Sequence, residues 1–288
     1  MKKGDATIAF FLHVTQSNSA NLMTLVQSII IAIVEGITEF LPISSTGHMI
    51  IAERLLLLPK DDTFIKLFTI AIQLGAILSV VVLYWKKFFD FSRWQFYLKL
   101  IVAVIPALAI GFLLSDRIDE LLDSPTTVAV SLLAGGFILL FIDKVFDRPV
   151  IDKERNITYT KGFMIGFWQC IAMVPGVSRS AASIIGGMQQ KLTRRLAAEF
   201  SFFLAVPTMA AATGYKLLKT FKEHPEVLKD KHNLAILGIG NLVAFIVALL
   251  AIKFFISYLQ RYGFKLFGWY RIIVGGILLV LIFAGYLN

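Results

Sequence analysis

Six long stretches of the chain contain only uncharged, mostly apolar residues. They cover residues 67–85, 100–115, 124–142, 200–215, 233–252 and 272–288. About 20 apolar residues in a helix cross the hydrocarbon core of a bilayer, and lipid offers no hydrogen-bond partner to an open backbone. The pattern therefore predicts about six transmembrane helices and an all-α integral membrane protein.

Two further apolar stretches differ from these six, because each is followed by or ends in a proline and a polar turn. Leu22–Val34 leads to Pro42, and Gly162–Ser178 contains Pro175. Backbone that breaks inside a membrane is tolerated only where protein or water satisfies its polar groups. We interpret both stretches as parts of re-entrant helical hairpins.

Composition supports this membrane interpretation. The chain has 288 residues, of which 57% are hydrophobic and 16% charged, and its mean hydropathy is +0.77. These values exclude a soluble globular domain. The net charge of +9 fits basic loops on the inner side of a membrane and contact with anionic lipid head groups, so no nucleic-acid partner is expected. Cys170 is the only cysteine, which excludes a disulfide within the chain.

The two predicted hairpins divide the chain into similar halves. Pro42 and Ser45 are repeated by Pro175 and Ser178 at an offset of 133 residues. Each hairpin is followed by three spans, an odd number, so the second half enters the membrane from the opposite face as an inverted-topology repeat. We divide the chain into an N-terminal extension at 1–22, a first repeat at 23–142, a cytoplasmic connection at 143–161 and a second repeat at 162–288.

The first hairpin carries a dense group of polar residues. Glu35 and Glu39 are four residues apart, so their carboxylates share one helix face. After Pro42 comes a turn whose hydroxyl residues suit the start of the next helix, followed by an imidazole. These residues are Ser44, Ser45, Thr46 and His48.

The second hairpin contains the cation that the first lacks. Arg179 lies in a hydroxyl-rich turn after Pro175, together with Ser178, Ser180 and Ser183. Both turns start helices, so unpaired backbone N–H groups and the positive end of a helix dipole favour an anion there. The guanidinium fork of arginine suits phosphate, and Glu35 and Glu39 offer the oxygen ligands that Mg²⁺ or Ca²⁺ uses beside substrate phosphates.

This combination favours phosphoryl transfer from a diphosphate embedded in the membrane, with His48 as a general acid or base. Each residue taken alone also has a structural interpretation. Ser44 and Ser178 suit plain helix caps, and Arg179 suits a structural ion pair with Glu35 or Glu39. Intramembrane glutamates also occur in proton relays, His48 could be a structural histidine, and Gln73 could join two helices.

The two polar stretches, Glu35–His48 and Pro175–Ser180, resemble the signatures of the bacterial undecaprenyl-diphosphate phosphatase family of the bacitracin-resistance type. Ile72–Gly75 and Glu199–Pro207 extend the resemblance. It covers the chain from Met23 to the C-terminus and leaves residues 1–22 outside. It implies an enzyme of the bacterial plasma membrane that hydrolyses undecaprenyl diphosphate to the monophosphate, recycles the lipid carrier of cell-wall synthesis and confers bacitracin resistance.

The resemblance also implies a role for each candidate residue. Glu39, Ser45, His48 and Arg179 correspond to catalytic positions, and Glu35 with Glu39 to the pair that binds a divalent cation, Mg²⁺ or Ca²⁺. The positions that contact the substrate phosphates would be Ser44, Thr46, Gln73, Ser178, Arg179, Ser180 and Ser183. Family members often have threonine where this chain has Ser183. The nucleophile stays open among Ser45, His48 and water.

The resemblance further implies that the active site opens to the extracytoplasmic side of the inner membrane, where it meets a polyprenyl diphosphate among membrane lipids. Inverted repeats with broken helices are also typical of transporters, so a polyprenyl-phosphate transporter or flippase is the main alternative. A proton-coupled channel is a weaker one, because it gives Arg179 no role. A homodimer stays open.

Overall fold

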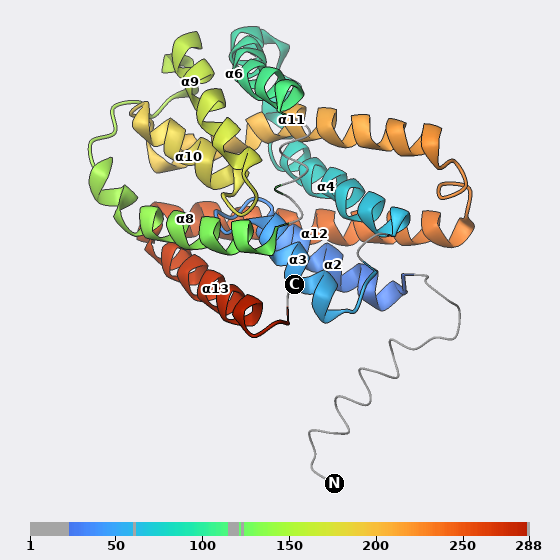
Figure 1. Cartoon of the computed structure of the whole chain (residues 1–288). Coiled ribbons are helices and arrows are strands. Elements are labelled where there is room, and N and C mark those ends of the chain that lie inside the picture. The colour runs from blue at the N-terminus through green and yellow to red at the C-terminus, as the bar shows by residue number, and fades with distance from the viewer. Residues whose placement is uncertain (1–22, 60–61, 115–120, 122–123, 287–288) are drawn as a thin grey trace.

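The computed structural model describes residues 23–59, 62–114, 121 and 124–286, so the predicted extension at 1–22 lies outside the described residues. Within the described part the chain is helical, apart from one isolated bridge between Ile151 and Leu192. Figure 1 shows the arrangement. The α-helices are α2 (Leu25–Thr38), α3 (Ser45–Leu55), α4 (Thr63–Leu83), α5 (Trp85–Phe88), α6 (Trp94–Leu113), α8 (Pro125–Val145), α9 (Tyr159–Gln169), α10 (Arg179–Gln189), α11 (Arg194–Glu223), α12 (Lys231–Tyr262) and α13 (Lys265–Phe283). Short 3₁₀ turns are η1 (Phe91–Arg93), η2 (Glu154–Asn156) and η3 (Cys170–Met173).

Six of these elements are long and apolar enough to cross a membrane, which confirms the prediction of about six spans for the described part of the chain. They are α4, η1 with α6, α8, α11, α12 and α13. The four helices of the predicted hairpins are shorter: α2 has 14 residues, and α3, α9 and α10 have 11 each. A helix of 14 residues is about 21 Å long, less than the hydrocarbon core of about 30 Å.

Several helices extend beyond the charge-free runs that predicted them. Helix α11 continues to Glu223, and α8 continues through Asp143 to Val145. Asp143 accepts hydrogen bonds from the Arg194 side chain at 2.6 Å and from the Phe264 backbone at 2.8 Å. Helix α9 begins at Tyr159, one residue after its cap Thr158. Caps and ion pairs thus carry both helices past the ends of their apolar runs and into the connection predicted at 143–161.

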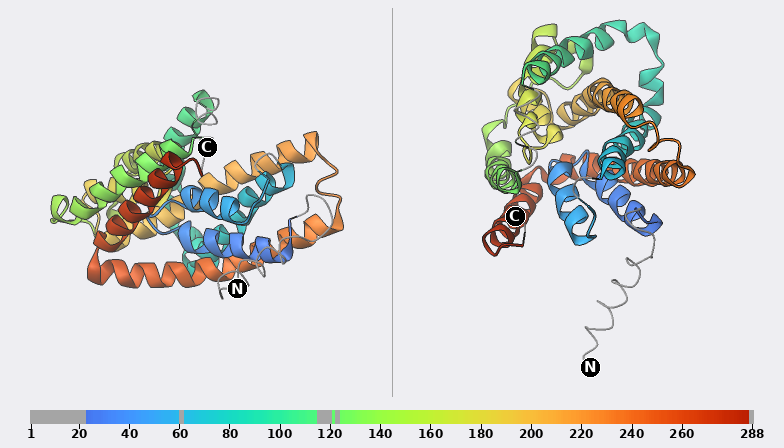
Figure 2. Two further views of the ribbon diagram at one scale, coloured as in Figure 1. Left: turned by 60° about the horizontal axis from the view of Figure 1, so that its bottom comes forward. Right: turned by 45° about the vertical axis from the view of Figure 1, so that its right-hand side comes forward.

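The short helices pair with each other and with spans of the opposite half of the chain. Helix α2 packs against α3 and α12, and α9 packs against α10 and α6. Helix α8 runs beside α13, and α4 contacts both α11 and α12 (Figures 1 and 2). The α6–α9 contact is very close, because a Cβ atom on Gly166 would overlap the backbone of Ala103. Any side chain at this position would separate the two helices.

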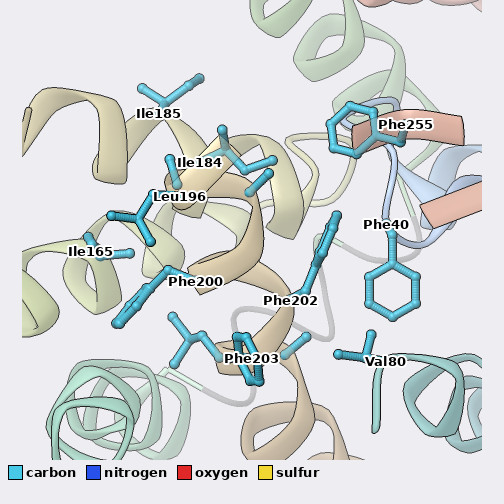
Figure 3. Close-up of a cluster of buried hydrophobic side chains, with 14 of the residues drawn as sticks. Phe40, Val80, Ile165, Ile184, Ile185, Leu196, Phe200, Phe202, Phe203 and Phe255 are labelled. Atoms are coloured by element: carbon cyan, nitrogen blue, oxygen red, sulfur yellow. The ribbon is translucent and has the colours of Figure 1, made fainter. Parts of the chain in front are cut away.

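The largest buried cluster lies under the first polar turn. Phe40, in the turn after α2, meets Phe202 of α11 edge to face, with ring centroids 5.3 Å apart. Figure 3 shows these two rings together with Val80 and the neighbouring Phe203. Phe40 and Phe202 are fully buried. The turn that carries the first set of candidate residues is thus anchored to a span of the second half.

Candidate active site

Both polar turns end in a serine that caps the following helix in the same unusual conformation. Ser44 has φ 71° and its hydroxyl accepts a hydrogen bond from Gly47 N at 3.4 Å. Ser178 has φ 77° and accepts from Ala181 N at 3.3 Å. Positive φ is uncommon for residues other than glycine, so the surrounding structure must hold both turns in place.

These caps change the match between the two repeats. The offset of 133 pairs Ser45 with Ser178, whereas the structure gives Ser44 and Ser178 the same cap position, at an offset of 134. Two residues separate Pro175 from its cap Ser178, whereas one separates Pro42 from Ser44, so no constant offset relates the two turns. The first helical residues are then Ser45 in α3 and Arg179 in α10.

The carboxylate of Glu39 connects these two residues. Ser45 Oγ donates a hydrogen bond to Glu39 Oε2 at 2.6 Å. Arg179 Nη2 donates to Glu39 Oε1 at 2.8 Å. The Glu39 side chain is only 6% exposed. The structure thus brings a hydroxyl, a carboxylate and a guanidinium from both hairpins into one buried contact, and one of the ion pairs that the sequence left open is present.

Arg179 is held on several sides but keeps one donor free. Its guanidinium lies over the ring of Phe40, with Cζ 5.5 Å from the centroid. Nη1 donates to the Ser201 carbonyl at 3.2 Å, and Nη2 approaches Met209 Sδ at 3.2 Å. The Nε–H group is buried and has no partner among the described residues. A fixed cation with an unused donor is suited to an anion such as phosphate.

Glu35 lies one helical turn before Glu39 and is 1% exposed. Its Oε1 atom is buried and has no hydrogen-bond partner in the described part of the chain. A buried carboxylate oxygen without a partner is costly. The position therefore has an unused acceptor that suits a cation or a donor from a ligand.

His48 faces away from this contact, toward α13. Its Nδ1 atom lies 2.7 Å from the Ser44 carbonyl, and its Nε2 atom lies 2.7 Å from the Tyr270 hydroxyl. Burial lowers the pKa of the His48 imidazole, because loss of water disfavours the charged form. The structure does not join His48 to Ser45 by a hydrogen bond within the described residues. Ser45 is hydrogen-bonded to Glu39 instead.

The remaining hydroxyls of the second turn bind protein groups. Ser180 Oγ donates to the Leu41 carbonyl of the first turn at 2.9 Å and lies 3.0 Å from Ser178 Oγ. Ser183 Oγ lies 2.8 Å from the Arg179 carbonyl and 2.6 Å from Ser201 Oγ. Ser180 and Ser183 are fully buried. Both side chains therefore fasten the turn in its present conformation.

Two candidates lie outside these contacts. Thr46 is the second residue of α3 and Gln73 lies in α4, and both are half-buried. Within the described residues, no hydrogen bond connects either side chain to the other candidates. A side-chain hydrogen bond between α4 and α12 is made instead by Asn241, whose Oδ1 accepts from Gly75 N at 2.9 Å.

Arg271 of α13 is the functional candidate that the sequence analysis missed. It is fully buried, and its five N–H groups are directed at five backbone carbonyls, two on α8 and three in the two turns. These acceptors are Ser131, Leu132, Pro42, Gly176 and Val177, at 2.8–3.3 Å. The sequence does contain a sign of this role, because Arg271 is a charged residue next to an apolar stretch. It escaped notice because the charge-free run was counted from Ile272, which places Arg271 just outside the predicted span.

The guanidinium of Arg271 needs space as well as acceptors. Gly135 of α8 provides it, because a Cβ atom there would overlap Arg271 Nη2. No carboxylate forms a salt bridge with Arg271 among the described residues, so carbonyl dipoles alone compensate its charge. One side chain thereby joins the Pro42 turn to the Gly176–Val177 turn and sets the distance between the two hairpins.

The chain is similar to known proteins over most of its length. The family model described as "Bacitracin resistance protein BacA" matches residues 28–277. An undecaprenyl-diphosphatase of Flavobacterium johnsoniae is 60% identical over 262 residues, which cover 91% of this chain and 97% of that protein. Proteins of the same name from Porphyromonas gingivalis and, as undecaprenyl-diphosphatase 1, from Clostridioides difficile are 52% and 41% identical, with 91% of this chain and 98% of each relative covered. The match spans both polar turns, and the chain therefore belongs to the bacitracin resistance protein BacA family.

Proposed function

We propose that this protein hydrolyses undecaprenyl diphosphate to undecaprenyl phosphate and inorganic phosphate. The observation that carries the proposal is the contact of Glu39 with both Ser45 and Arg179. It places a nucleophile and a phosphate-binding cation at the starts of two helices, where anions are favoured, and joins both to one proton acceptor. Relatives up to 60% identical carry the name undecaprenyl-diphosphatase. The reaction recycles the lipid carrier of peptidoglycan synthesis and confers bacitracin resistance.

In the first step of the proposed mechanism, Ser45 Oγ attacks the terminal phosphorus. The new Oγ–P bond forms while the bond from phosphorus to the bridging oxygen breaks, and undecaprenyl phosphate leaves. Glu39 accepts the hydroxyl proton, because Ser45 already donates to its Oε2. Arg179 stabilises the charge that spreads over the phosphoryl oxygens, with its free Nε–H as the extra donor.

In the second step a water molecule attacks the phosphoserine. The bond from phosphorus to water forms, the bond to Ser45 Oγ breaks, and the serine oxygen recovers its proton from Glu39. His48 takes one proton of the attacking water and releases it to the solvent before the next turnover. It lies three residues after Ser45 on the same helix, with its Nε2 atom at the Tyr270 hydroxyl.

The residues present fit a divalent cation at Glu35 and Glu39. Glu35 has a buried oxygen without a partner. The described residues contain no group of three histidine, cysteine or acidic side chains that would enclose a metal by themselves. Mg²⁺ is commonly bound through one or two carboxylates, with substrate phosphates and water as the other ligands. When bound, Mg²⁺ or Ca²⁺ would neutralise the phosphate charge and polarise phosphorus for attack.

We also propose that the short helices form two re-entrant hairpins of an inverted repeat. In support, α2 packs on α12 while α9 packs on α6, which are corresponding pairs in such a repeat. The caps Ser44 and Ser178 share one conformation. The site would open to the extracytoplasmic side of the bacterial inner membrane, the side on which the diphosphate lipid is released.

The relatives do not support the transporter alternative, since they are named as diphosphatases. The test is inorganic phosphate release from undecaprenyl diphosphate by the detergent-purified protein, with Mg²⁺, with Ca²⁺ and after chelation. We expect release that requires a cation and that falls by about 10³-fold in Glu39→Gln. Glu223→Gln, an exposed glutamate near the end of α11, is the matched control. Release that persists without any divalent cation would refute the metal proposal, and no release at all would refute the function.

A further inference from the structure

We infer that Tyr270 is a positioning residue for His48. The inference rests on the proposed acid–base role of His48 and concerns a residue of α13 that is 222 positions away in sequence. The Tyr270 hydroxyl lies 2.7 Å from His48 Nε2. The two rings are nearly parallel, with an interplanar angle of 7° and centroids 5.5 Å apart. Tyr270 therefore contacts both the face and the edge of the imidazole.

The hydrogen bonds assign the tautomer of His48. Its Nδ1 atom is 2.7 Å from the Ser44 carbonyl, and a carbonyl oxygen can only accept. Nδ1 must therefore carry a hydrogen. In the neutral imidazole the Nε2 atom then has the lone pair and accepts from the Tyr270 hydroxyl. Nε2 is thus the ring nitrogen that can take up a proton, and it is hydrogen-bonded to Tyr270.

A tyrosine hydroxyl can serve His48 in both of its protonation states. It donates to the neutral Nε2 atom and, after its hydrogen rotates, accepts from the protonated one. Phenylalanine can do neither. Since Tyr270 is 40% exposed, its hydroxyl has space for this rotation, whereas the opposite ring nitrogen is fixed on the backbone of the Ser44 turn.

The neighbour of Tyr270 explains why α13 can hold His48 accurately. Arg271 binds the Pro42 carbonyl at 3.3 Å and the Gly176 carbonyl at 2.8 Å. Arg271 therefore binds both turns, and the preceding residue, Tyr270, binds the imidazole of His48. Helix α13 fixes the orientation of the acid–base group relative to Ser45, and this orientation sets the rate of a proton transfer.

The test compares Tyr270→Phe, His48→Gln and the double variant in phosphate release. We expect Tyr270→Phe to lower kcat about tenfold, a part of the 10²–10⁴ that positioned acid–base groups contribute, with KM within twofold of the wild-type value. The double variant should be no slower than His48→Gln, because a residue that acts only through His48 has nothing left to position. Tyr262→Phe, an exposed tyrosine at the end of α12, is the matched control.

The outcomes separate this inference from the proposed function. Unchanged kcat in Tyr270→Phe beside a slow His48→Gln would overturn the positioning role and leave the phosphatase intact. A double variant that is tenfold slower than His48→Gln would also overturn it, because Tyr270 would then act independently of His48. Full activity of His48→Gln would instead refute the acid–base role in the proposed mechanism.

Discussion

The two polar turns share one backbone plan but differ in what their side chains are free to do. In α3, which follows the first turn, Ser45, Thr46 and His48 are half-buried, and Ser45 contacts Glu39. In the second, Ser180 and Ser183 are fully buried and bonded to carbonyls or to another serine. In the proposed mechanism the first turn therefore supplies the reacting groups, and the second supplies a fixed cation.

The difference is clearest at the first residues of α3 and α10. Ser45 and Arg179 follow equivalent caps and meet the same carboxylate of Glu39. A hydroxyl at that position can form a covalent bond to phosphorus, whereas a guanidinium can only bind charge. The proposed mechanism thus gives complementary chemical roles to two residues that follow caps of the same conformation.

The largest expected effect is at Arg179. Arg179→Ala should lower kcat/KM for phosphate release by at least about 10³-fold, since it removes the only guanidinium paired with Glu39 among the described residues and leaves that buried carboxylate without a cation. Arg179→Lys should recover only part of the loss, because lysine lacks the planar fork. Near-normal turnover in Arg179→Ala would show that the second hairpin takes no part in the reaction.

A smaller but decisive contrast separates the two serines at the start of the first helix. Ser45→Ala should lower kcat about 10²–10³-fold, because it removes the proposed nucleophile. Ser44→Ala removes a cap, which costs about 1 kcal/mol of stability, and should mainly lower the melting temperature. Mass spectrometry of the protein quenched during turnover should detect a phosphate on Ser45. Equal activity losses in the two variants would contradict the distinction between reacting group and cap.

The smallest effect should be found at Ser183, which follows the second turn in α10. Ser183→Ala loses hydrogen bonds to the Arg179 carbonyl and to Ser201, and should destabilise the protein by about 1 kcal/mol with less than a fivefold change in kcat. Ser183→Thr keeps the hydroxyl and should retain activity within twofold. Thermal unfolding and phosphate release measured on the same preparations would check both. A large loss of kcat without loss of stability would mean that Ser183 contacts the substrate.

The sequence predicted the local features of the fold well. Apolar runs mark the six candidate spans because burial in lipid requires an apolar surface on nearly every side of a helix. Pro42 and Pro175 mark the breaks between short helices, since proline cannot continue a hydrogen-bonded helix. The helix ends were predicted less well, because Thr158 and Asp143 extend α9 and α8 beyond their apolar runs through caps and ion pairs.

By itself the sequence determined that the protein is an all-helical membrane protein, that two polar turns interrupt it and which residue types they contain. Only the tertiary structure decided which of them meet. Glu39 and Arg179 are 140 positions apart, and His48 and Tyr270 are 222 apart. The role of Arg271 depends on five carbonyls from three segments. Backbone carbonyls are the same in every residue, so no sequence pattern marks them as acceptors, and packing alone brings them within reach of one side chain.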